Sequence, residues 1–134
     1  MKIVSIIKIF LFIGLIKFYF VDFQSNLLFK TWRFKAIDKE DTRRYIYENA
    51  QNLNGEYSGY TFFPNGKLTV KQTIHSCPVG EKLEFEIVEG KWKMINDTLI
   101  SLQHLRFGKP MEDKRIISSV TENKLVLKFN RKYK

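Results

Sequence analysis

Apolar and polar residues alternate along most of the chain from Phe29 onward. The pattern is clearest in four segments, which are WRFKA (residues 32–36), KLTVK (67–71), LEFEI (83–87) and LVLKF (125–129). Because successive side chains of a strand point to opposite faces, each segment predicts a strand with one dry face and one wet face. The side chains expected on the dry faces are Trp32, Phe34, Ala36, Leu68, Val70, Leu83, Phe85, Ile87, Leu125, Leu127 and Phe129.

Residues that favour tight turns separate the predicted strands. Asn65 and Gly66 give the strongest of these signals, because both residue types tolerate positive φ. The other turns are expected at residues 78–80, Gly90, residues 96–97, 108–110 and 122–123. Short strands joined in this way predict an all-β fold, an antiparallel up-and-down barrel or half-barrel of about seven to eight strands.

Gly90 is expected to end one strand and begin the next, because glycine adopts the unusual dihedral angles of a tight turn. In the segment GKWKMINDTL, Trp92 is then expected to point into the interior, between the outward-facing Lys91 and Lys93. The glutamates of LEFEI would face these lysines across the turn as oppositely charged cross-strand pairs.

The segment DKEDTRRYIYENAQNLNG, residues 38–55, alternates less regularly. Four of its residues recur at roughly helical spacing, and they are Tyr45, Ile46, Asn49 and Leu53. Gly55 suits the position that follows the end of a helix. A short helix near residues 39–52 is therefore expected, with a loop and an irregular strand as the alternative.

The first 24 residues form a unit separate from the barrel domain expected over residues 25–134. Lys2 and Lys8 precede the apolar run IFLFIGLI. Positive charge followed by an apolar run is the order of a secretory signal peptide. The following residues, FYFVDFQSN, lack the pair of small residues that marks cleavage, so an uncleaved N-terminal membrane anchor is the alternative. Either interpretation predicts an extracytoplasmic protein, secreted, periplasmic or membrane-anchored, that contacts the membrane only through this segment.

The composition fits one folded domain rich in strands. The chain of 134 residues contains 12 Phe, 6 Tyr and 2 Trp, and large rings are frequent in strands and bury much area. Its net charge is +9, but the basic residues are spread along the chain without a nucleic-acid-binding motif. No nucleic acid is therefore expected as a partner.

No recognisable constellation of catalytic, cofactor-binding or metal-ligating residues occurs in the sequence, so we expect no enzymatic activity, cofactor or metal. His75 and Cys77 lie two residues apart and His104 is distant, which is unlike the spacing of zinc sites. Cys77 is the only cysteine, so it can form no disulfide within the chain. A disulfide between the Cys77 residues of two copies of the chain is the remaining hypothesis.

Four segments occur in a suggestive order between about residues 27 and 130, and they are LLFKTWRFKAID, FFPNGKL, GKWKMINDTLISL and RIISSVTENKLVLKF. In this order they resemble the lipocalin-like domains of small exported bacterial proteins. The resemblance implies an up-and-down antiparallel β-barrel, often without an established activity. The chain departs from typical ligand-carrying lipocalins at Lys30, where a glycine usually stands two residues before the first tryptophan.

Two functions fit these expectations. The first is non-catalytic binding of a small apolar or amphiphilic ligand, or of a cell-envelope component, by the barrel. The alternative is an extracytoplasmic protein-interaction module of the inhibitor or immunity type, because Tyr and Arg are enriched at interfaces. Its surface would be formed by exposed side chains, which are Arg43, Arg44, Tyr45, Tyr47, Tyr57 and Tyr60.

Overall fold

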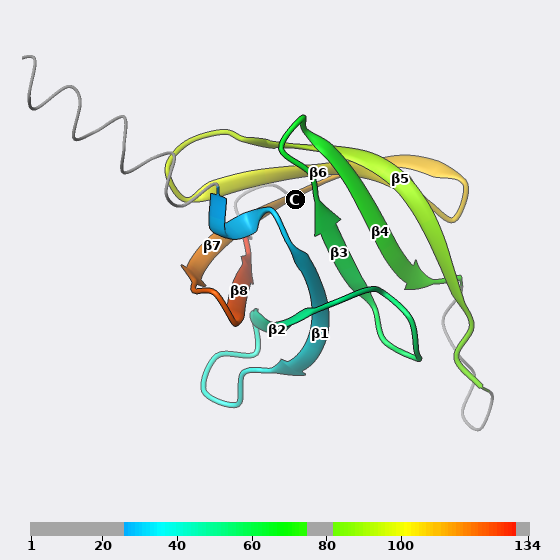
Figure 1. The fold of residues 1–134 in the computed structure, drawn as a ribbon, viewed down its shortest axis with the longest axis horizontal. Helices are drawn as coiled ribbons and strands as arrows, with labels where there is room; N and C mark the ends of the chain where they lie inside the picture. Colours follow the sequence, from blue (N-terminus) through cyan, green and yellow to red (C-terminus); the bar gives the residue numbers. More distant parts are fainter. Residues whose placement is uncertain (1–25, 75–81, 131–134) are drawn as a thin grey trace, which may run out of the picture.

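The computed structural model describes residues 26–74 and 82–130, which form eight antiparallel strands. The strands are β1 (Thr31–Ile37), β2 (Arg44–Ala50), β3 (Gly59–Phe62), β4 (Lys67–Thr73), β5 (Phe85–Met94), β6 (Leu99–Arg106), β7 (Lys109–Val120) and β8 (Lys124–Phe129). They close into one barrel in the order β1-β2-β8-β7-β6-β5-β4-β3, and β3 pairs back onto β1 (Figure 1). The predicted all-β antiparallel fold is confirmed, and of the two alternatives, barrel and half-barrel, the structure shows the closed barrel.

The strands follow the chain around the barrel with one exception. β3 to β8 form an up-and-down meander, but β1 lies between β2 and β3, and β2 pairs with β8. Residues 51–58 therefore carry the chain from one edge of β1 to the other. Leu53 of this crossing segment is buried, and its carbonyl accepts a hydrogen bond of 2.6 Å from Lys71 Nζ. Because Lys71 alternates with the buried Val70, the crossing segment packs on the outside of the barrel.

One end of the barrel is filled by apolar side chains. Its fully buried members include Trp32, Phe62, Leu68, Ile100, Leu102, Leu125 and Leu127. Residues 26–28 form a helical turn beside the start of β1, drawn in blue in Figure 1. Leu28 of this turn belongs to the core cluster, and its carbonyl accepts a hydrogen bond of 3.1 Å from Trp32 Nε1. The turn thus joins the core at this end, which we call the packed end.

Most of the predicted turns are confirmed. Gly66 adopts a φ of 83° between β3 and β4, where the side chain of Asn65 accepts a backbone hydrogen bond. Asn96 accepts two backbone hydrogen bonds in the same manner between β5 and β6. Gly108 lies at positive φ between β6 and β7, and residues 121–123 join β7 to β8. The local turn chemistry therefore fixes where these hairpins reverse.

The predicted turn at Gly90 is wrong, because Gly90 lies inside β5, a continuous strand of 10 residues. A Cβ atom at this position would lie 2.2 Å from the carbonyl oxygen of Gln103 and 3.0 Å from Cβ of His104. Glycine is needed here for the close approach of β6 and not for a turn. The glutamates and lysines on either side of Gly90 consequently share one strand and do not pair across a turn as predicted.

The predicted dry face of the segment 83–87 is also wrong. Leu83 and Ile87 are exposed, with 62% of Ile87 accessible to solvent, and Phe85 is only partly buried. Val88 and Trp92 pack against the core instead, as predicted for Trp92. β5 runs through Gly90 without a break. The inward orientation of Trp92 therefore fixes which side chains at the start of the strand point inward and which point outward.

The short helix predicted near residues 39–52 is wrong, and the alternative of a loop followed by a strand is correct. Tyr45 and Tyr47 occupy alternate positions of β2 and pack against the core, so the period is two. A bulge in β1 between Phe34 and Ala36 shifts the register, which leaves Ala36 exposed where burial was predicted.

Several predictions fall outside the described residues. They concern the signal peptide or anchor at residues 1–24, the turn at residues 78–80, and the pair His75 and Cys77. Among residues 26–74 and 82–130, no helix has the length and apolar character needed to cross a membrane.

Candidate ligand cavity

The end of the barrel opposite the packed end contains a cavity of about 540 Å³. Ligand pockets in proteins commonly measure roughly 300–1,000 Å³, so the space suits a small organic molecule. Five aromatic side chains line it, and they are Phe34, Tyr45, Tyr47, Tyr60 and Phe129. Five polar side chains that carry the argument below also line it, and they are Gln72, His104, Arg106, Asp113 and Arg115.

The aromatic side chains contact one another around the cavity. The ring centroids of Phe34 and Tyr45 are 5.7 Å apart, and those of Tyr45 and Phe129 are 4.9 Å apart in an edge-to-face arrangement. Tyr47 and Tyr60 form a further pair at 5.5 Å. Such ring pairs attract one another and bury much area, so they form a continuous aromatic wall.

Arg115 lies on the cavity wall as a buried cation, with only 7% of the residue exposed. Its Nη2 and Nε atoms lie 2.6 and 2.8 Å from the same carboxylate oxygen of Asp113. The guanidinium carbon lies 3.5 Å from the ring centroid of Phe129, which is a cation–π contact. Its Nη1 atom is buried without a hydrogen-bond partner in the described structure.

Burial and ion pairing shift the pKa of Arg115 in opposite directions. Desolvation disfavours its charge, but the hydrogen bond that it donates to Asp113 and the nearby phenols of Tyr60 and Tyr47 leave the pKa of Arg115 above its ordinary value. Burial raises the pKa of Tyr60, and the positive charges of Arg115 and Arg106 partly oppose this rise. The arginine is therefore charged, and both phenols are neutral at physiological pH.

Gln72 is the second buried polar side chain with an unpartnered atom. Its Nε2 donates to the carboxylate of Glu86 at 3.0 Å and to the carbonyl of Leu105 at 2.8 Å. These two acceptors fix which end of the amide is the nitrogen. Oε1 is then an acceptor that is buried without a partner in residues 26–74 and 82–130. Buried polar atoms are nearly always paired, so an unpartnered atom in each of two cavity-lining residues, Gln72 and Arg115, is unusual.

His104 and Arg106 extend the polar side of the cavity along β6. The Nδ1 atom of His104 lies 3.1 Å from the carbonyl oxygen of Leu105. Because a carbonyl can only accept, Nδ1 is the donor in this contact. Arg106 is exposed and stacks on the ring of Phe107 at 5.2 Å.

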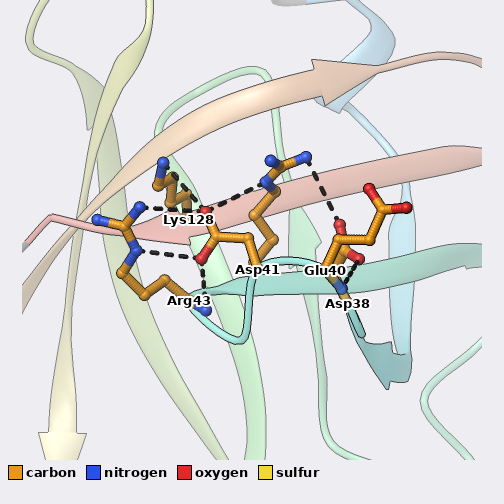
Figure 2. Close-up of polar contacts among 6 residues, drawn as sticks. Asp38, Glu40, Asp41, Arg43 and Lys128 are labelled. Carbon is orange, nitrogen blue, oxygen red and sulfur yellow. Dashed lines mark hydrogen bonds and ion pairs between the residues drawn. The ribbon is translucent and has the colours of Figure 1, made fainter.

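The turn between β1 and β2 is held by ion pairs at the same end of the barrel. Figure 2 shows the carboxylate of Asp41 between Arg43 and Lys128, at 3.1 and 3.2 Å. Arg44 lies 3.5 Å from Asp41 and from Asp38. Hydrogen bonds from the side chain and backbone of Arg43 hold the pKa of the Asp41 carboxyl well below its usual range.

The exposed surface of tyrosines and arginines predicted for a protein partner does not exist as one patch. Tyr45, Tyr47 and Tyr60 line the interior cavity, whereas Arg43 and Arg44 pair with aspartates of their own turn. Tyr57 alone of the four tyrosines is exposed, and it stacks on Arg33 at 4.8 Å.

Sequence reasoning named none of the polar cavity residues as a site, although a signal was present. In β7, Asp113 and Arg115 share one strand face with the apolar Met111 and Ile117. In β4, Gln72 continues the face of the buried Val70. Polar residues that continue an apolar face indicate a polar region inside a barrel.

The described part of the chain holds no group of three or more His, Cys, Asp or Glu side chains that could bind a metal ion. No protein-family model matches the chain, and no curated protein or solved structure matches it either.

Proposed function

We propose that this protein binds a small apolar or amphiphilic molecule in the cavity of its barrel, without catalysing a reaction. The observation that carries the proposal is the unequal filling of the interior. One end is packed with apolar side chains, and the other holds a cavity of about 540 Å³ whose lining includes five aromatic side chains and two residues with an unpartnered buried polar atom. A barrel that served only as a rigid surface would gain stability from a filled interior.

The proposal places the protein outside the cytoplasm, like the exported lipocalin-like domains that its sequence resembles. Support comes from the order of charged and apolar residues in the first 24 positions. Membrane contact is assigned to that segment alone, and no nucleic acid, cofactor or metal is part of the proposal.

An envelope protein is the second candidate occupant, and one observation favours it. Four apolar side chains are exposed near the cavity end of the barrel, and they are Leu83, Ile87, Leu105 and Phe107. Exposed apolar groups that are close together often mark contact surfaces. Such a partner would cover the mouth of the cavity and would not enter it.

Native mass spectrometry of the protein purified from its own host tests the proposal. We expect a mass excess of a few hundred daltons that disappears on denaturation, together with the same compound in an organic extract. Met111→Trp should lower this excess, because Met111 lines the cavity and the larger ring would take up part of its space. Leu105→Trp is the matched control, since Leu105 is exposed on the neighbouring strand and should keep the ligand. A bound protein, or a small-molecule excess that Met111→Trp leaves unchanged, would contradict the proposal.

A further inference from the structure

We infer that the ligand is an organic anion, whose acidic group lies by Arg115 and Arg106 and whose flat unsaturated body packs on the aromatic wall. The inference rests on the proposed function and names the chemical class of the ligand. It depends on the charges that face the cavity, on the free donor of Arg115 and on the rings beside it.

The charged groups of the cavity wall leave a positive excess. Lys71 and Glu112 belong to outward positions, where Lys71 binds the carbonyls of Leu53 and Gly55 and Glu112 accepts from Ser101. The groups that remain for the cavity are the cations Arg106 and Arg115 and the single anion Asp113.

Glu86 is not among the cavity-lining residues, but its carboxylate accepts the amide of Gln72 and adds a negative charge beside the wall. His104, which lines the cavity, donates from Nδ1 to a backbone carbonyl. The positive excess therefore applies to the lining residues, and an anion at the two arginines would balance it.

Arg115 has the unused donor that an acidic group requires. Asp113 occupies Nε and Nη2, which leaves Nη1 without a partner. A guanidinium presents its donors in a fixed fork and binds two carboxylates at once when a second one is within reach. Burial strengthens the attraction, since an ion pair that is shielded from water is screened less by solvent and salt.

The rings select the rest of the molecule. Phe129 covers the guanidinium at 3.5 Å, and Tyr45 lies 5.6 Å from the same carbon. A flat unsaturated ligand can stack on these faces while its acid reaches the arginines. The free Oε1 of Gln72 would accept a hydrogen bond from a hydroxyl or N–H group of the same ligand.

Two fluorescent probes that differ in one group test the inference. 8-Anilinonaphthalene-1-sulfonate carries a sulfonate, and N-phenyl-1-naphthylamine is the same molecule without it. We expect the wild-type protein to bind the sulfonate at least about tenfold more tightly, the size of one charge-assisted hydrogen bond. Met111→Trp should weaken binding of both probes, which places them in the cavity.

A double variant, Asp113→Asn with Arg115→Gln, removes both charges and leaves neither buried without its partner. The preference for the sulfonate should then fall clearly, with only the share due to Arg106 remaining and the neutral probe bound as before. The matched control is Arg33→Gln with Glu48→Gln, a half-exposed ion pair on the outer face of β1 and β2, and it should keep the preference. Circular dichroism and thermal melting establish that each variant is folded.

The outcomes separate the two proposals. If neither probe binds the wild-type cavity, the proposed function fails. If both bind equally, if the cavity variant keeps the preference, or if it weakens both probes alike, only the assignment of an anion fails. Should the double variant not fold, competition on the wild-type protein decides. 2-Naphthoate should displace the neutral probe at least about tenfold more effectively than 2-naphthamide, and equal displacement would overturn the inference.

Discussion

Gly90 and Gly108 occupy two kinds of position that a sequence does not distinguish. Gly108 lies in a turn with a φ of 72°, and a Cβ there would meet no atom within 4 Å. Gly90 has no positive φ, but a Cβ would meet the backbone of Gln103. The sequence predicted a turn at both, because backbone freedom is the commoner reason for glycine. Close approach of a neighbouring strand depends on pairing that no local pattern reveals.

Gly90→Ala should destabilise the barrel more than Gly108→Ala. The first substitution forces β5 and β6 apart, because the obstructing atom is a carbonyl oxygen of the backbone, and we expect a loss of about 2–3 kcal/mol. The second places alanine at positive φ without a clash and should cost about 1 kcal/mol. Urea unfolding of the two variants gives both values. A loss for Gly90→Ala equal to or below that for Gly108→Ala would contradict the close-approach explanation.

The buried location of the polar cavity residues could not be predicted from the sequence pattern alone. Asp113 and Arg115 belong to a run of four charged residues, 112–115, and charged residues are mostly exposed, so the sequence pattern by itself does not mark these two as buried. Only the pairing of β7 with β6 and β8 fixes their face as the inner one. A buried ion pair therefore leaves a weak signal, since its partners are two residues apart and satisfy each other.

At the scale of the element, the strands were predicted well where a single face stays apolar throughout. β4 and β8 keep Leu68 and Val70, or Leu125 and Leu127, in the core as predicted. The prediction failed for the start of β5, where apolar residues alternate on the outer face. Alternation gives the period of a strand but leaves the choice of face to the rest of the barrel.

The turn between β1 and β2 gives a pH-dependent contribution to stability. Ion pairs lower the pKa of Asp41 in the folded state, chiefly through Arg43, so folding is favoured while this group is ionised. The contribution is complete above about pH 4, the ordinary pKa of an aspartate, and is lost as the pH falls below it toward the folded-state pKa.

Asp41→Asn should accordingly lower the Tm at pH 7, and the difference from wild type should shrink steadily below about pH 4. Asp97→Asn, in the exposed turn between β5 and β6, is the control and should change the Tm little at either pH. Thermal melts at pH 7 and at pH 3 make the comparison. A difference for Asp41→Asn that stays constant across this range would exclude the ion-pair explanation.

At the scale of the whole molecule, the sequence predicted the architecture but not the division of its interior. Turns and period-two segments are local properties, so the barrel class and the hairpins β3–β4, β5–β6, β6–β7 and β7–β8 could be predicted. The insertion of β1 between β2 and β3 could not, because the crossing segment depends on Leu53, Gly59 and Lys71 meeting far from one another in sequence. The cavity likewise arises only when faces from several strands come together.

This division predicts that stability and binding depend on opposite ends of the barrel. Leu102 is fully buried in the packed end, so Leu102→Ala creates a new void and should cost about 3 kcal/mol. Met111 lines an existing cavity, so Met111→Ala should cost less than about 1 kcal/mol. Urea unfolding measures both, and N-phenyl-1-naphthylamine reports binding. The first variant should lose stability and keep its affinity for the probe, whereas the second should keep stability and change its affinity. Equal losses of stability would mean that the cavity end is as tightly packed as the other, and that the interior is one continuous core.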